Sequence, residues 1–211
     1  MSKEYGYITG KEIEQGFRNN KGIFTPQDII ELDQENKWTN FGQLELISTS
    51  TITDGSALIL TDLKETIYNV HFYTFQYNPS ENNRGINIQF SNDGGTSYYS
   101  SYQVAYQSGN GSGSFGETRS TSNSYLLPTF NTGNDTGETI NSYGYLYNLG
   151  DSTKYSFNTS MQTFLDTAQN YYMLFGSSVL AQAVQINTIK VDDFSTGSYN
   201  LDFSLYGIRF A

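Results

Sequence analysis

The side chains that could take part in catalysis are few and scattered. His71 is the only histidine, and the chain has no cysteine. General acid–base or nucleophilic catalysis needs a histidine held beside a nucleophile or a carboxylate. His71 stands in an aromatic run between Val70 and Phe72, with no such partner at a recognisable spacing. We therefore expect His71 to be a hydrogen-bonded structural residue and the chain not to be an enzyme.

Carboxylates occur mostly where turns are expected. Asp54, Asp62, Asp135 and the pair Asp192-Asp193 are of this kind. Turn oxygens can ligate calcium, and two carboxylates facing each other across a cleft can cleave a glycosidic bond. No spaced ligand motif is present and no carboxylate pair stands out. We therefore predict that these carboxylates are solvated turn residues and that the chain binds no metal and no cofactor. A glycan-cleaving enzyme is the weakest alternative function.

One acidic turn has a recognisable pattern. The segment Ser91-Asn92-Asp93-Gly94-Gly95-Thr96-Ser97-Tyr98 resembles the Asp-box turn of sialidase-type propellers. Those propellers carry several copies, whereas this chain has one and is too short for such a fold. We expect Asp93 to accept hydrogen bonds from backbone N–H groups in its own turn. The alternation of Ile86–Phe90 before the turn and the run Tyr98–Tyr106 after it predict a β-hairpin.

Tyrosine is the side chain most suited to binding a ligand, and the chain has 18 of them. Tyrosines on one strand face, or beside the Gly/Ser-rich segment 107–124 expected to be a flexible loop, could stack on sugar rings or fill a protein interface. Ordinary packing in a half-exposed sheet is the more frequent role. The candidate ligand-binding residues are Tyr98, Tyr99, Tyr102, Tyr143, Tyr145 and Tyr147.

The elements that must position these residues are strands. Nine or ten short strands follow one another at roughly 8–15-residue spacing after residue 43. The run Ile67–Tyr77 is apolar or aromatic at nearly every position, which predicts a central strand covered on both faces or a strand in an interface. We expect Lys154–Leu165 to be a strand in which Tyr155 and Phe157 point inward. Residues 43–211 are predicted to form an all-β, antiparallel two-sheet β-sandwich of the jelly-roll type.

Residues 1–42 differ from this pattern and are predicted to form an N-terminal arm. Twelve of the 32 charged residues fall within the first 37 positions. Thr25 and Pro26, followed by Asp28, predict the start of one short helix. The arm could wrap its own domain or anchor it to a larger assembly. The apolar residues expected to anchor it are Ile23, Phe24, Ile29, Leu32 and Trp38.

The net charge of the chain limits the classes of partner that it can bind. The formal net charge is -10 and the pI is near 4.4, without basic clusters. Such a chain repels phosphate backbones and anionic membranes, so nucleic-acid binding is not expected. We see no signal-peptide pattern at the N-terminus and no run of transmembrane length, so membrane insertion is not expected either.

Three short segments together resemble small jelly-roll structural proteins of marine and cyanobacterial tailed phages. The first covers Asn20–Ile29 with Trp38 and Gly42–Ile47, the second is Ile88–Gly95, and the third is Phe203–Ile208. The resemblance implies a non-enzymatic virion component on the capsid surface or tail, of the decoration, head-fibre or tail-accessory type. It also implies contacts with other virion proteins and a homo-oligomer, for which we favour a trimer. The main alternative is a tail-fibre module that binds a host receptor or surface glycan.

Overall fold

The structure is a computed structural model, and it describes residues 15–16, 19–20, 27, 30, 44–127, 131–135, 137–194 and 197–208. The chain divides into two units, Met1–Gln43 and Leu44–Phe210. In the first unit, β1 (Gln15–Gly16) and β2 (Asn19–Asn20) form an antiparallel pair. The expected anchoring residues Ile23, Phe24, Ile29, Leu32 and Trp38 lie outside the described residues, as does most of the expected short helix.

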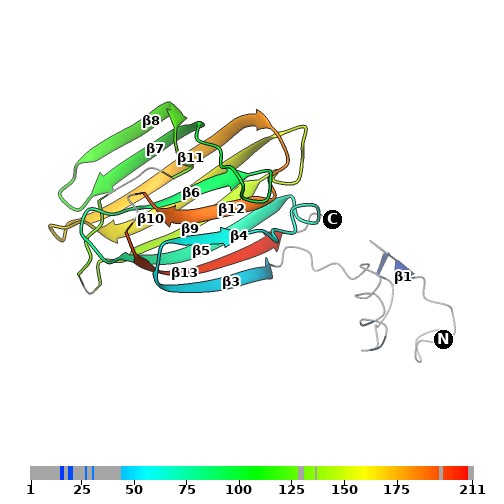
Figure 1. Ribbon diagram of the computed structural model, residues 1–211, viewed down its shortest axis with the longest axis horizontal. Coiled ribbons are helices and arrows are strands. Elements are labelled where there is room, and N and C mark those ends of the chain that lie inside the picture. The colour runs from blue at the N-terminus through cyan, green and yellow to red at the C-terminus, as the bar shows by residue number, and fades with distance from the viewer. Residues whose placement is uncertain are drawn as a thin grey trace. The chain divides into compact units, whose positions relative to one another are not determined.

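The second unit consists of two antiparallel sheets (Figure 1). The larger sheet has eight strands in the order β3-β13-β5-β9-β10-β11-β7-β8, and the smaller has three in the order β4-β12-β6. The strands are β3 (Leu44–Gly55), β4 (Ala57–Leu60), β5 (Val70–Pro79), β6 (Ile86–Ser91), β7 (Tyr102–Asn110), β8 (Phe115–Asn123), β9 (Ile140–Tyr147), β10 (Tyr155–Leu165), β11 (Tyr171–Ala183), β12 (Thr188–Asp193) and β13 (Tyr199–Ile208).

The core lies between the two sheets. The smaller sheet contributes Ile88, Phe90 and Val191, and the larger contributes stacked rings such as Tyr73 and Phe203, all buried. Figure 1 shows the smaller sheet in front of the larger one. The predicted antiparallel two-sheet β-sandwich is confirmed, and its two sheets are unequal in size.

The β-hairpin predicted around the Asp93 turn is wrong, because the strands on either side of the turn do not pair with each other. β6 belongs to the three-stranded sheet, where it pairs with β12, whereas β7 belongs to the eight-stranded sheet. The turn therefore carries the chain from one sheet to the other. The only backbone bond back to β6 in this stretch is from the Tyr99 N–H to the Phe90 carbonyl, at 2.9 Å.

The segment 107–124 was predicted to be a flexible loop, and this too is wrong. It forms most of a long hairpin, in which β7 pairs with β8 from Gly109↔Phe115 to Tyr102↔Asn123. The Gly/Ser residues are concentrated in the tight turn, where Asn110 accepts hydrogen bonds from the backbone N–H groups of Ser112 and Ser114. Short polar side chains of this kind suit an edge strand as well as a coil.

Within the described residues, the structure contains no apolar helix of membrane-spanning length.

Candidate functional site

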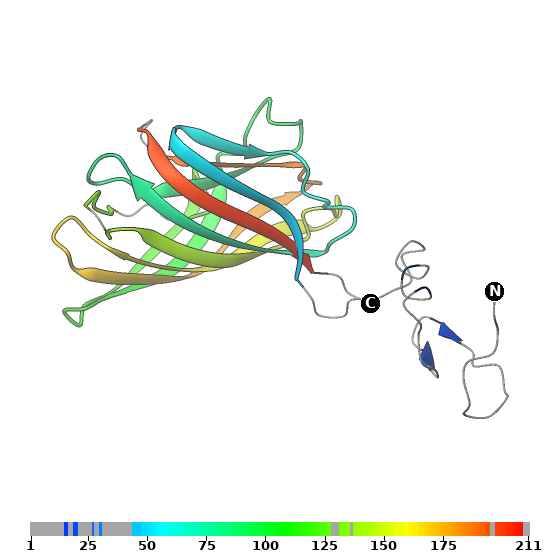
Figure 2. The same ribbon diagram turned by 90° about the horizontal axis from the view of Figure 1, so that it is seen from below.

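The candidate site is the face of the eight-stranded sheet that is turned away from the three-stranded sheet, which we call the outer face. Among the described residues of this unit, no strand packs over it (Figure 2). Eight of the eleven exposed large apolar residues among the described residues lie on it. Cross-strand registers place on it Leu44, Leu46, Phe72, Phe115, Tyr143, Tyr145, Tyr147, Tyr155, Phe157, Met161, Tyr171, Met173, Phe175, Tyr206 and Ile208.

Two central strands, β9 and β10, reverse the usual amphipathic pattern: polar side chains face the core, and aromatic side chains face outward. In β10 the buried positions are Ser156, Asn158, Ser160, Gln162 and Phe164, of which only the last is apolar. The expectation that Tyr155 and Phe157 point inward is therefore wrong: they are 48% and 42% exposed. β9 is inverted in part, with Ser142 and Gly144 turned inward on either side of the outward Tyr143. The aromatic surface is thus on the outside, where an ordinary sandwich has its polar face.

A hydrogen-bonded network makes the inversion of β10 tolerable. The Tyr73 hydroxyl donates to Asn158 Oδ1 at 2.9 Å, and Asn158 Nδ2 donates to the Tyr106 hydroxyl at 2.8 Å and to Ser178 Oγ at 3.3 Å. The Tyr106 hydroxyl also lies 3.1 Å from Ser160 Oγ. Burial raises the pKa of both tyrosines, so their hydroxyls stay protonated. The network therefore satisfies Asn158 and Ser160, as buried polar groups require, whereas Ser156 Oγ and Gln162 Nε2 on the same strand have no hydrogen-bond partner among the described residues.

Two glycines make room for the tyrosine rings of this network. One cross-strand row runs Tyr73, Gly144, Ser160, Gly176, Tyr106 over β5, β9, β10, β11 and β7. A Cβ atom at Gly144 would lie 2.5 Å from the Tyr73 ring, and one at Gly176 would lie 2.9 Å from the Tyr106 ring. Each ring therefore lies across a glycine, and both hydroxyls reach the middle strand β10.

On the outer face the rings form a connected cluster. Phe72 contacts Tyr145, with ring centroids 5.1 Å apart, and also Tyr206 at 6.0 Å and Tyr143 at 6.4 Å. Tyr145 stacks on Tyr147 at 6.4 Å. Cross-strand aromatic contacts of this kind restrict the rotamers of the side chains that make them.

The middle of the outer face carries no charge. The five adjacent strands β5, β9, β10, β11 and β7 contain no Asp, Glu, Lys or Arg, in a chain with 32 charged residues. The outer-face charges lie toward its margins, with Asp202 on β13 and the pair Glu117 and Arg119 on β8. Depletion of charge together with exposed Tyr, Phe and Met is typical of the centre of a protein–protein interface.

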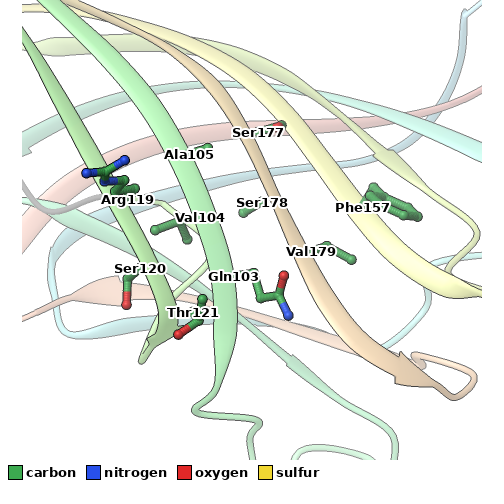
Figure 3. Close-up of a pocket in the computed structure, with 10 residues that line it drawn as sticks. All are labelled: Gln103, Val104, Ala105, Arg119, Ser120, Thr121, Phe157, Ser177, Ser178 and Val179. Carbon is green, nitrogen blue, oxygen red and sulfur yellow. The ribbon is translucent and has the colours of Figure 1, made fainter.

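A hollow of about 460 Å³ opens at one end of this sheet. Figure 3 shows the ten residues that line it, from β7, β8, β10 and β11. Small side chains at Ala105 and Ser177 form part of its lining, with Phe157, Gln103 and Arg119 around them. The hollow can accept an apolar group with a polar edge.

A second hollow, of about 400 Å³, has a polar lining. It is lined by side chains of β3, β5 and β13, with Thr139 just before β9. Asp202 accepts a hydrogen bond from the Thr51 hydroxyl at 2.7 Å, and Gln76 lies opposite Asp202 in the sheet. Amide, hydroxyl and carboxylate groups in this arrangement suit the hydroxyls of a sugar.

The structure divides the six predicted tyrosines into two groups. Tyr143, Tyr145 and Tyr147 lie together on the outer face, as their spacing indicates. Tyr98 follows the Asp93 turn and packs its ring under Lys190 Nζ at 4.9 Å. Tyr99 is partly buried against the core. Tyr102 is fully buried and accepts a hydrogen bond from the Phe90 N–H at 2.8 Å, so it is not available to a ligand.

Most of the outer face was not singled out from the sequence. Phe115, Phe157, Tyr171 and Phe175 are exposed on it and were not among the predicted site residues. One signal could have found the sheet to which they belong, namely the run of strands without charged residues. That signal marks a sheet but does not say which of its faces is exposed.

Several carboxylates in the described part of the chain stabilise the fold through hydrogen bonds and ion pairs. Asp93 accepts hydrogen bonds from the Ser97 hydroxyl at 2.6 Å and the Ser97 N–H at 2.9 Å, and these bonds lower its pKa to about 2. The predicted role of Asp93 in its own turn is confirmed. The prediction that Asp192 and Asp193 are solvated turn residues is wrong, because both lie in β12 and Asp193 is buried. Asp193 accepts a hydrogen bond from the Tyr77 hydroxyl at 2.6 Å and pairs with Arg84. Among the described residues, no three acidic or histidine side chains come together as a metal site would require.

His71 is buried on the core side of β5. Its Nε2 lies 2.8 Å from the Leu63 carbonyl, so Nε2–H donates, and Nδ1 has no hydrogen-bond partner. Burial lowers the pKa of His71, because a proton on Nδ1 would place an unpaired charge in the core.

The folded state should therefore lose stability when His71 becomes protonated in the unfolded chain. A lowered folded-state pKa means that the unfolded chain binds the proton more readily below its ordinary pKa of about 6.5. The free energy of unfolding should fall as the pH drops from 7.5 to 5.5, and His71→Gln should reduce this slope. Urea unfolding at the two pH values measures it. Equal slopes for the two proteins would contradict the prediction.

No protein family, curated protein or solved structure matches the chain in sequence or fold comparisons.

Proposed function

We propose that this protein is a non-enzymatic structural subunit of a phage virion. In this proposal residues 44–208 form an exposed β-sandwich that makes protein–protein contacts through its outer face. Residues 1–42 anchor the subunit to the capsid surface or tail. The sequence resemblance to small virion proteins of tailed phages supports the virion setting, and the outer face supports the assembly role.

The observation that carries the assembly role is the inversion of β9 and β10. An isolated domain gains stability by burying aromatic rings and exposing Ser, Asn and Gln. This chain buries Asn158, Ser160 and Gln162 while Tyr143 and Phe157 stay exposed. Departures of this kind from ordinary patterning concentrate at functional sites. A surface that is apolar and uncharged fits contact with another protein surface.

The proposal predicts that the chain is a stable component of particles. Particles purified by density gradient from a lysate that contains this gene should carry the chain in a fixed ratio to the major capsid protein. Quantitative mass spectrometry of the gradient fractions measures this ratio. A chain that stays entirely in the particle-free fractions would contradict the proposal.

Deleting residues 1–40 separates the anchor from the domain. The shortened chain should keep its strand content by circular dichroism, because the described sandwich begins at Leu44, and it should no longer co-purify with particles. Unchanged incorporation would remove the anchoring role from the arm and leave the domain itself as the attachment.

A receptor- or glycan-binding module is the second candidate. The polar hollow around Thr51, Gln76 and Asp202 supports it, with Tyr143 on the neighbouring strand β9. A ring that stacks on a sugar beside hydroxyl-binding groups is a common arrangement for carbohydrate recognition. A glycan array and a host-cell binding assay test this candidate, and two blank results would exclude it.

A further inference from the structure

The apolar area of the outer face is large enough for a stable interface. Seven of its exposed residues are 42–59% exposed, and Phe115 is 85% exposed. Taking on the order of 200 Å² for a fully exposed large apolar residue, these eight leave roughly 840 Å² open to solvent. A specific interface buries about 800 Å² on each partner, and the largest apolar patch on a typical monomer is about 300–600 Å². The area thus matches one side of a whole interface.

The chemistry of the face indicates which partner fits. The chain carries a formal net charge of -10, so two copies repel each other over most of their surfaces. The strands β5, β9, β10, β11 and β7 are the place where that repulsion is smallest, because they contain no Asp, Glu, Lys or Arg.

We propose that a second copy of this chain covers the outer face, so that two eight-stranded sheets pack face to face about a two-fold axis. This inference rests on the proposed function, in which the outer face is a protein-contact surface, and it names the partner. Two sheets packed in this way interleave side chains in a layer about 10 Å thick, as the two sheets of a sandwich do. When two copies pair through the same face, the assembly is closed and cannot add a third copy. The unit is therefore a dimer rather than the trimer favoured from the sequence.

Each copy also offers a protruding and a receiving part. Phe115 on β8 is 85% exposed, and its ring lies above Gly109, its partner residue on β7. The hollow lined by Ala105 and Ser177 opens on neighbouring strands. In a two-fold interface every such pair occurs twice, because each copy supplies both surfaces. A protruding ring and a hollow on one face give that face the self-complementary shape that a dimer of identical chains requires.

The mass of the full chain in solution, with matched charge substitutions, tests the inference. Light scattering after size exclusion at about 100 μM should give twice the mass of one chain. Phe175→Glu and Tyr143→Glu, each at a position 47% exposed on the outer face, should weaken the dimer at least ~100-fold by placing unpaired charge in it. Ile59→Glu, at a position 52% exposed on β4 of the other sheet, is the control and should leave the dimer unchanged.

Cysteine cross-linking gives a second measurement, and its result does not depend on whether the charge variants remain folded. The chain has no cysteine, so Thr159→Cys introduces one thiol in the middle of the outer face, and Ile59→Cys introduces one on the other sheet. A flexible bismaleimide cross-linker should trap a covalent dimer of the first variant and not of the second, whereas a direct disulfide would form only if the two-fold axis passed beside residue 159. A monomeric wild-type chain would overturn the inference. So would a dimer that survives both outer-face charges, or one that cross-links through residue 59.

The outcomes also separate this inference from the proposed function. A monomeric chain that still co-purifies with particles, and loses them on Phe175→Glu, means that another virion protein covers the outer face. That result overturns the dimer and keeps the function. A dimer that never co-purifies with particles keeps the dimer and overturns the virion role.

Discussion

Replacing Asn158 with leucine should destabilise the domain by about 3 kcal/mol, because a buried donor or acceptor left without a partner costs roughly 1–3 kcal/mol. The change keeps the side-chain volume and removes both polar atoms. Tyr73 then loses the acceptor at 2.9 Å, and Tyr106 and Ser178 lose the amide donor that reaches them both. Urea unfolding of N158L and wild type, followed by circular dichroism, measures the difference.

A double mutant tests whether the loss comes from the network or from packing. In the N158L background, Tyr73→Phe removes the hydroxyl that lost its acceptor. The two substitutions should therefore cost less together than the sum of their separate costs, with a coupling of about 1 kcal/mol or more. Thr163→Ala, on the outward side of the same strand, is the matched control and should change stability by no more than ~0.5 kcal/mol. Strict additivity of N158L and Y73F would show that the network does not hold β10 in place.

The sequence is informative about features that depend on neighbouring residues. Tyr143, Tyr145 and Tyr147 share a face because successive strand side chains alternate, and this needs no knowledge of the fold. The Asp93 turn is formed by bonds among Ser91, Asp93 and Ser97, all within seven residues. The sandwich follows from many short alternating strands in the same way. These three predictions are confirmed because each depends on a period or a local bond.

Features that depend on distant residues could not be predicted. Whether Phe157 or Asn158 of β10 faces the core depends on Tyr73 and Tyr106. These two tyrosines come from β5 and β7 and are more than 50 residues away in the sequence. Patterning alone puts the aromatic residue inside, and the network reverses it. The Asp93 turn gives no information about whether β7 pairs back on β6, since a tight turn can equally pass between sheets.

The exposed aromatic face and the buried polar network are two sides of one arrangement. Each inward polar residue of β10 fixes an outward neighbour, so the Asn158 contacts also hold Phe157 and Thr159 on the outer face. A strand that slipped by one residue would bury the aromatic rings and break the network at once. The core polar bonds therefore specify which face is available for assembly.

Substituting Gly144 with alanine should be the other strongly destabilising single change. A Cβ atom at this position would lie 2.5 Å from the Tyr73 ring and 2.7 Å from the Thr159 carbonyl oxygen. The ring cannot move away without breaking its bond to Asn158, and the carbonyl belongs to the backbone of β10. Forcing extra volume into a packed core costs about 1–3 kcal/mol, and the broken hydrogen bond adds about 1 kcal/mol. Thermal unfolding should show a lower midpoint for G144A.

Gly111→Ala is the control, because its Cβ would meet nothing closer than 3.7 Å. That variant should lie within ~0.5 kcal/mol of wild type, since a surface substitution in open space changes little. If Tyr73 is the group that obstructs the methyl, Tyr73→Leu should recover part of the loss in G144A, although the same change costs stability in wild type. A recovery would show that Gly144 is required for the tyrosine ring that lies across it. Equal losses from Y73L in both backgrounds would instead place the obstruction at the Thr159 carbonyl, and the register of β9 against β10 would then depend on backbone spacing alone.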